Sequence, residues 1–134
     1  MQTEDVIKIL QSELGFNNTS IGKLKSFSER LIVANKNHNF ISKNTENAIW
    51  HRHILDSAQI TKYIGFEDNR SLSDFGTGAG FPGLVLSIFN KNPKFHVKLY
   101  EKSNIKCDFL ENIKNKLNLE CDVVGRYQDD EITS

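Results

Sequence analysis

Few cysteines, no long apolar run and no excess of either charge set the first limits on this 134-residue sequence. Its two cysteines, Cys107 and Cys121, do not form a Cys-x-x-Cys pair, which excludes a disulfide framework or zinc site and favours reduced cytoplasmic thiols. No apolar run approaches the roughly 20 residues that a membrane span requires, and the N-terminus lacks a secretion signal. Because 17 basic and 17 acidic residues balance to a net charge of zero, any RNA contact must come from a local patch.

The first half of the chain is predicted to be helical. Apolar residues at helical spacing predict three helices, at residues 3–14, 20–35 and 45–64. Thr45 is the expected N-cap of the third helix, and the Asn-rich residues 35–39 are expected to form a loop. His51 and His53 lie two residues apart and would point to different sides of a helix, which disfavours a metal site.

The second half alternates strands with helices, which is typical of α/β proteins. We expect strands at residues 71–75, 95–100 and 120–124, and helices at residues 82–89 and 104–117. The chain is therefore divided into an N-terminal helical region, residues 1–69, and a partial α/β domain, residues 70–134.

The most informative stretch follows the first predicted strand, where Asp74 precedes a loop with four glycines. Glycine lets the backbone adopt conformations closed to other residues and lets a ligand approach the main chain. Pro82 suits the first turn of the following helix, where no backbone N–H is lost. Strand, glycine turn and helix together predict a nucleotide- or cofactor-binding βαβ unit.

Two carboxylates bear on which cofactor this loop binds. Residues 78–83 match the G-x-G-x-x-G of dinucleotide-binding folds, but that match alone is weak. Asp74 disfavours a nearby pyrophosphate and suits the sulfonium and ammonium groups of S-adenosylmethionine (SAM). Glu101 closes the second strand, where a carboxylate accepts hydrogen bonds from ribose hydroxyls in SAM and NAD sites alike. SAM is the favoured cofactor, and NAD is the distant alternative.

Three motifs together resemble a known family. They are the segment Trp50-His51-Arg52-His53-Ile54-Leu55-Asp56-Ser57, the loop from Asp74 to Gly83, and Glu101-x-Ser103 followed by Lys106, Phe109 and Leu110. The sequence resembles the bacterial 16S rRNA guanine-N7 methyltransferase G family, also called glucose-inhibited division protein B. The resemblance implies an α/β fold, in which N-terminal helices precede the first half (strands 3-2-1) of a class I SAM-dependent methyltransferase Rossmann-like sheet.

The resemblance also implies the binding residues. SAM would contact the glycine loop, the end of the second strand and the pair after Arg126, namely Asp74, Gly76, Thr77, Gly78, Gly80, Phe81, Glu101, Tyr127 and Gln128. The family usually has Glu as the second residue of that pair, so Gln128 offers a hydrogen bond to adenine without a charge. Candidate contacts to 16S rRNA of the small ribosomal subunit are Lys36, Lys43, Arg52 and His53.

No catalytic acid, base or nucleophile stands out in the sequence. Guanine N7 carries a free lone pair, so methyl transfer to it requires alignment of N7, methyl carbon and sulfur but no general base. This absence is what the implied reaction predicts.

The family continues beyond the last residue of this chain, through a fourth strand to a sheet of order 3-2-1-4-5-7-6. On that basis we expect the first strand to be a sheet edge that favours self-association, and we expect the 134-residue form not to methylate rRNA. The alternatives are an inactive SAM-binding remnant of the family and, more distantly, an NAD-binding domain.

Overall fold

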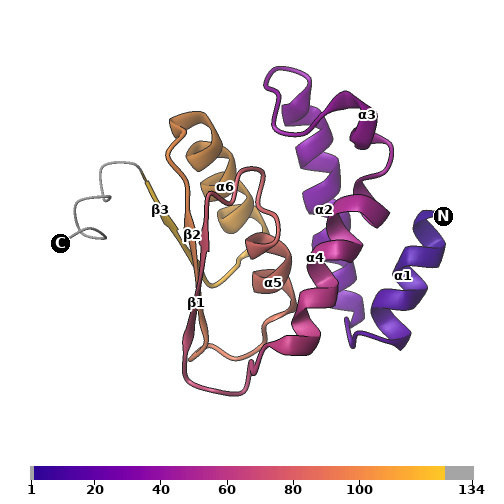
Figure 1. Cartoon of the computed structure of the whole chain (residues 1–134), viewed down its shortest axis with the longest axis vertical. Coiled ribbons are helices and arrows are strands. Elements are labelled where there is room, and N and C mark those ends of the chain that lie inside the picture. The colour runs from indigo at the N-terminus through magenta and orange to yellow at the C-terminus, as the bar shows by residue number, and fades with distance from the viewer. Residues whose placement is uncertain (1, 126–134) are drawn as a thin grey trace.

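The computed structural model describes residues 2–125 and shows a group of N-terminal helices beside a small parallel sheet (Figure 1). The elements are α1 (Thr3–Ser12), α2 (Asn18–Asn35), α3 (Lys43–Glu46), a π-helical turn η1 (Ile49–Ile54), α4 (Leu55–Gln59), a 3-10 turn η2 (Ile60–Tyr63), β1 (Ser71–Phe75), α5 (Gly83–Phe89), β2 (His96–Tyr100), α6 (Asn104–Leu117) and β3 (Cys121–Val124). The predicted α/β fold class is confirmed.

Local side-chain chemistry sets the start of α2. The helix begins two residues before its predicted start, because the Asn17 side-chain oxygen accepts a hydrogen bond from Ser20 N at 2.8 Å and so caps it. Gly15, with a φ of 79°, makes the left-handed turn that separates α1 from α2. The loop predicted at residues 35–39 begins where α2 ends.

The single helix predicted at residues 45–64 is wrong. Ser42 caps α3 by accepting a hydrogen bond from Thr45 N at 3.3 Å, so Thr45 lies inside that helix and is not its N-cap. Ala48 (φ −118°, ψ 23°) leaves helical geometry, and the chain then forms η1 before α4. Ile49 and Ile54, five residues apart, are both buried because a π-helical turn closes with i→i+5 bonds. The apolar spacing alone did not reveal this wider turn.

The sheet places the carboxyl ends of its strands side by side. All pairings are parallel, in the order β1-β2-β3, which confirms the predicted 3-2-1 order. Asp74 lies opposite Leu99, and Phe75 lies opposite Tyr100. Among the residues that the structure describes, β1 pairs on one side only, as expected for an edge strand. The loops after β1 and β2 therefore meet at one edge of the sheet, where α/β proteins bind ligands.

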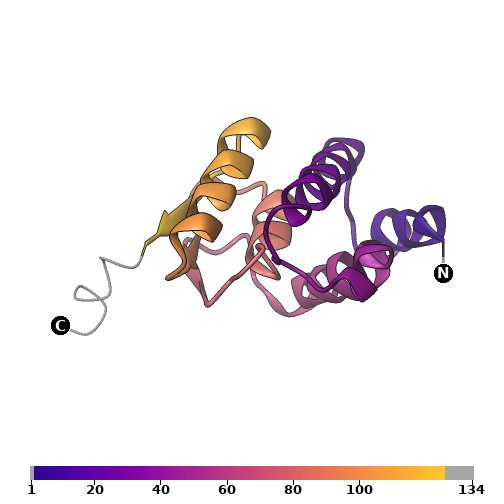
Figure 2. The same cartoon turned by 90° about the horizontal axis from the view of Figure 1, so that it is seen from above.

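All helices that cover the sheet pack on one face of it. Figure 1 shows α5, α6 and the N-terminal helices on the same side, and Figure 2 shows this arrangement from above. Val97 and Leu99 on that face are fully buried, together with Phe27 of α2. The other face exposes Phe75, whose ring stacks on that of Tyr100 with the two ring centroids 4.5 Å apart. One core thus includes side chains from both sides of residue 70, and the division into two regions stays a prediction.

Candidate cofactor and nucleic-acid site

The glycine loop leaves β1 with a backbone that glycine adopts far more easily than other residues. Gly76, Gly78 and Gly80 have φ values of 70°, 58° and 107°. Gly76 N donates a hydrogen bond to the carbonyl of Tyr100 at 2.8 Å, which ties the loop to the end of β2. A Cβ added at Gly76 or Gly78 would meet no atom within 4 Å, so both positions border open space. The predicted order of strand, glycine turn and helix is confirmed.

Asp74 holds the start of α5 in place. Its Oδ2 accepts a hydrogen bond from Gly83 N at 2.9 Å. Burial raises the pKa of Asp74 above its ordinary value, while the Thr77 hydroxyl and the Gly83 N–H both act to lower it. The carboxylate that the sequence assigned to a ligand is therefore also a brace for the loop.

Gly83 is required for a different reason from the three glycines before it. A Cβ at this position would collide with the Leu99 side chain and would lie 2.8 Å from Asp74 Oδ2. The absence of a side chain lets α5 begin directly above the end of β1. Gly83 thus positions Asp74 and the helix, whereas Gly76 and Gly78 keep the loop open.

Glu101 joins the two loops at the carboxyl edge of the sheet. Its Oε1 accepts a hydrogen bond from Gly78 N, and its Oε2 accepts one from Ser103 N, both at 2.9 Å. Ser103 then caps α6 by accepting a hydrogen bond from Lys106 N. Because a carboxylate has about four acceptor positions, Glu101 keeps capacity for two ligand hydroxyls while holding both loops.

His53 of η1 lies against the glycine loop. Its ring and that of Phe81 have centroids 4.9 Å apart and planes 24° apart, and its Nε2 lies 3.3 Å from Thr45 Oγ1. Burial lowers the pKa of His53, Asp56 acts to raise it, and Arg52 lowers it further. At neutral pH the ring is therefore mostly uncharged, so it provides a stacking surface and a hydrogen bond more than a positive charge.

Buried Asn35 shapes the loop that carries the two predicted lysine contacts. Its Oδ1 accepts hydrogen bonds from Phe40 N at 2.9 Å and Ile41 N at 3.0 Å, and its Nδ2 donates to Glu46 at 2.8 Å. Lys36 and Lys43, which the sequence suggested as RNA contacts, are exposed at the two ends of this loop. The contact between Thr45 and His53 links the Lys43 end to the glycine loop.

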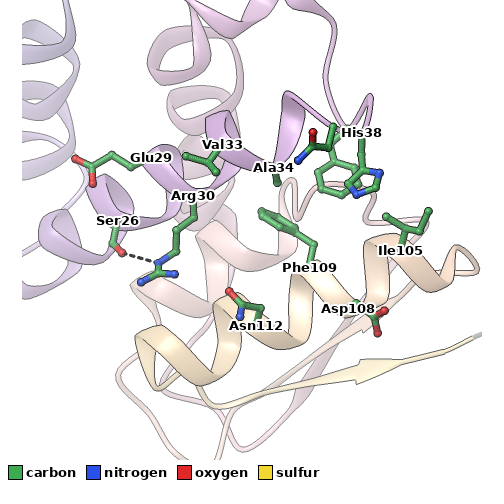
Figure 3. Close-up of a pocket in the computed structure, with 12 residues that line it drawn as sticks. Ser26, Glu29, Arg30, Val33, Ala34, His38, Ile105, Asp108, Phe109 and Asn112 are labelled. Atoms are coloured by element: carbon green, nitrogen blue, oxygen red, sulfur yellow. Dashed lines mark hydrogen bonds between the residues drawn. The ribbon is translucent and has the colours of Figure 1, made fainter.

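A cavity of about 690 Å³ lies between α2, the loop after it and α6 (Figure 3). The rings of Phe40 and Phe109 are 5.0 Å apart, and His38 stacks on Phe40 at 5.5 Å. The sequence reasoning did not identify this cavity. The available signal was weak: Val33 and Ile105 extend the apolar stripes of their helices yet remain exposed.

Three further predictions concern the residues after β3, metal binding and membrane spans. Arg126, Tyr127 and Gln128 lie outside the described residues 2–125. Within that span, no three His, Cys, Asp or Glu side chains gather closely enough to hold a metal ion. Nor does any helix there combine the length and apolar content needed to cross a membrane.

The fold and the loop define a class of protein. A parallel sheet, a glycine turn after β1 and carboxylates at the ends of β1 and β2 form part of a Rossmann-like methyltransferase domain. The chain belongs to the rRNA small subunit methyltransferase G family (GidB), whose model matches residues 20–131. This confirms the resemblance drawn from the three motifs.

Individual relatives agree with this assignment. The chain is 37% identical to Ribosomal RNA small subunit methyltransferase G of Fusobacterium nucleatum over 107 residues, which cover 80% of the chain and 45% of the relative. The identity to the protein of the same name from Rickettsia felis is 41% over 108 residues, or 79% and 53% of the two chains. The identity to the protein of that name from Bartonella henselae is 37% over 117 residues, which cover 87% of this chain and 52% of the relative. The chain thus spans about half the length of these relatives.

Proposed function

We propose that this chain binds SAM at the glycine loop and that this site serves an rRNA methyltransferase, which transfers the methyl group of SAM to N7 of a guanine in 16S rRNA in the cytoplasm. The observation that carries the proposal is the bracing of the loop by Glu101. Its carboxylate accepts hydrogen bonds from Gly78 N and Ser103 N, so two loops that approach one ligand are fixed by one side chain.

The residues present fit SAM. Open space lies in front of Gly76 and Gly78, where a ligand can reach the backbone. Asp74 and Glu101 supply negative charge beside that space, which suits the sulfonium and ammonium groups of SAM and disfavours a pyrophosphate. Glu101 has acceptor capacity for the ribose hydroxyls, and Phe81 offers an apolar ring beside the loop.

The protein's share of the reaction is alignment and electrostatics. When bound, SAM supplies an electrophilic methyl group. Glu101 and the glycine loop fix the ribose end of the site, and Asp74 provides negative charge at the end of β1. The guanine N7 lone pair needs no deprotonation, so no residue has to act as a general base.

RNA binding is assigned to the cations around η1 and the loop after α2. Lys36, Lys43 and Arg52 are exposed and suit phosphate contacts. His53 is half-buried against Phe81 and suits contact with a base. These four residues lie on elements linked through Asn35 and Thr45.

Calorimetric titration of the purified chain tests the cofactor. We expect SAM and its demethylated product to bind and NAD to bind more weakly. Gly78→Val should abolish binding, because valine is strained at a φ of 58° and its side chain would enter the open space. Gly22→Val is the matched control, since Gly22 also borders open space but lies in α2. Tighter binding of NAD than of SAM would contradict the proposal.

Transfer of tritiated methyl groups from SAM to unmethylated small ribosomal subunits tests the reaction. Wherever methyl transfer occurs, mass spectrometry of the digested RNA should identify N7-methylguanosine. Methylation at another atom or base would contradict the assignment to guanine N7 while leaving the cofactor site intact.

A further inference from the structure

A second, smaller cavity adjoins the glycine loop. It has a volume of about 250 Å³ and is lined by Arg52, His53, Asp56, Ser57, Ile60, Phe81 and Pro82. Pockets for drug-sized ligands measure roughly 300–1,000 Å³, so this one suits a single base better than a whole cofactor. It combines a wall of two stacked rings, a cation and a carboxylate.

Asp56 and Arg52 present unused polar groups at this cavity. They lie four residues apart, on the same side of the η1–α4 segment, and both are exposed. Neither side chain makes a hydrogen bond or an ion pair of 4.0 Å or less with any residue in the described part of the chain. Both remain available to a ligand.

We propose that Asp56 is the residue that selects guanine, by accepting hydrogen bonds from N1–H and the N2 amino group of the target base in this cavity. The inference rests on the proposed function. Adenine presents an acceptor at N1 and no amino group at C2, so it would leave the Asp56 carboxylate facing a lone pair. A site built to bond a substrate N–H rejects analogues that lack it far more strongly than an apolar pocket does.

The rest of the cavity completes the recognition. The base stacks on the outer face of the His53–Phe81 ring pair, as unstacked RNA bases do on aromatic side chains. Arg52 pairs with the phosphate of the same nucleotide or its neighbour. Because N7 lies on the Hoogsteen edge and N1–H and the N2 amino group lie on the Watson–Crick edge, a guanine bound through Asp56 leaves N7 uncovered for methyl transfer.

An alternative role for Asp56 is purely electrostatic, since its charge acts to raise the pKa of His53. The two roles give different results. If the role is electrostatic, replacing Asp56 would alter the affinities for guanine and adenine equally. If Asp56 selects the base, replacing it would alter the ratio of the two affinities.

Nucleotide titrations of the full chain, in the presence of S-adenosylhomocysteine, test the proposal. The probes are the 5′-monophosphates of guanosine, adenosine, inosine and 7-deazaguanosine, and fluorescence of Trp50, the single tryptophan beside His51, reports binding. We expect guanosine monophosphate to bind at least about fivefold more tightly than the adenosine form. Inosine, which keeps N1–H but lacks the N2 amino group, should be intermediate, and 7-deazaguanosine, which keeps both donors, should match guanosine.

Asp56→Asn and Asp56→Ala should reduce the ratio of guanosine to adenosine affinity to within about twofold. Glu67→Gln, an exposed acid outside the cavity, should leave it unchanged. Equal affinity of the wild type for both nucleotides, no detectable guanosine binding, or a ratio that survives Asp56→Asn would each overturn the proposal. The proposed function is tested by different measurements. It would fail if SAM did not bind, or if the methyl group were transferred to an atom other than N7, even where the preference for guanosine over adenosine was observed.

Discussion

At the scale of single residues, the two acids assigned to the ligand turn out to serve the backbone as well. Sequence position alone placed Asp74 and Glu101 at the ends of their strands. It could not show that Gly83 N, Gly78 N and Ser103 N donate to them, because those bonds depend on how two loops close over the sheet. The residues were predictable, and their partners were not.

Asp74→Asn should separate the stability of the fold from ligand binding. The pKa of Asp74 is raised in the folded state, so its contribution to stability is fully present below the unfolded pKa of about 3.9 and is lost as the pH rises through the folded value. Asparagine keeps an acceptor for Gly83 N and does not ionise. The melting temperature of the variant relative to wild type should therefore rise by a few degrees from pH 4 to pH 7.

In the same variant, affinity for SAM should fall roughly 5- to 30-fold at pH 7, the effect of losing about 1–2 kcal/mol of charged interaction. Thermal unfolding at both pH values and calorimetry measure the two effects. Asp108→Asn, at an exposed position of α6, is the control. If the melting temperature of Asp74→Asn relative to wild type falls as the pH rises, the assigned direction of the Asp74 pKa shift is wrong.

Glu101→Gln should weaken both the loop and the cofactor site. A glutamine side chain has one acceptor oxygen and an NH2 group, so it cannot accept from Gly78 N and Ser103 N together. One N–H is left unpaired, and we expect a loss of about 1–2 kcal/mol in the free energy of unfolding. Urea titration measures it, with the exposed Glu120→Gln as control. If Glu101→Gln changes neither the free energy of unfolding nor the SAM affinity, Glu101 neither holds the loops nor binds the cofactor.

At the scale of elements, sequence periodicity succeeded for strands and long helices and failed at residues 45–64. The apolar residues of that segment keep a plausible helical spacing, yet Ala48 breaks the helix and η1 widens the next turn. This is where Arg52 and His53 project toward the glycine loop. Periodicity reports which side of a segment is buried, and it does not register a change from α- to π-helical hydrogen bonding.

Asn35→Ala tests how the loop after α2 is held. The buried Asn35 side chain bonds Phe40 N, Ile41 N and Glu46, so its removal leaves backbone donors without partners. We expect a loss of about 1–3 kcal/mol in the free energy of unfolding and faster hydrogen exchange at Phe40 and Ile41. Asn37→Ala, an exposed neighbour, should have little effect. Retained exchange protection would show that the loop is held by its aromatic packing instead.

At the scale of the whole molecule, the order of the sheet was predictable because parallel βαβ units leave few arrangements. The cavity between α2 and α6 was not predictable, because it forms where two helices far apart in sequence meet without filling the space between Val33 and Ile105. Composition likewise gives a net charge of zero without placing the cations. The structure places Arg52 at the cavity beside the glycine loop, and Lys36 and Lys43 at the two ends of the loop after α2.

Salt dependence tests whether RNA binding uses this local patch or the whole surface. With a net charge of zero, only the exposed cations near η1 and the loop after α2 are expected to contact phosphates. Three contacts, from Lys36, Lys43 and Arg52, give a slope of log K against log salt of about −2 for single-stranded RNA. Replacing Lys36 and Lys43 by Ala should reduce that slope by about 1.4, without changing SAM affinity. The same change at Lys91 and Lys94, which lie in the turn before β2 at the other end of the strands, removes equal charge and should leave the slope alone. A slope several times steeper, or an equal response to both pairs, would mean that phosphates are bound across the surface rather than beside the glycine loop.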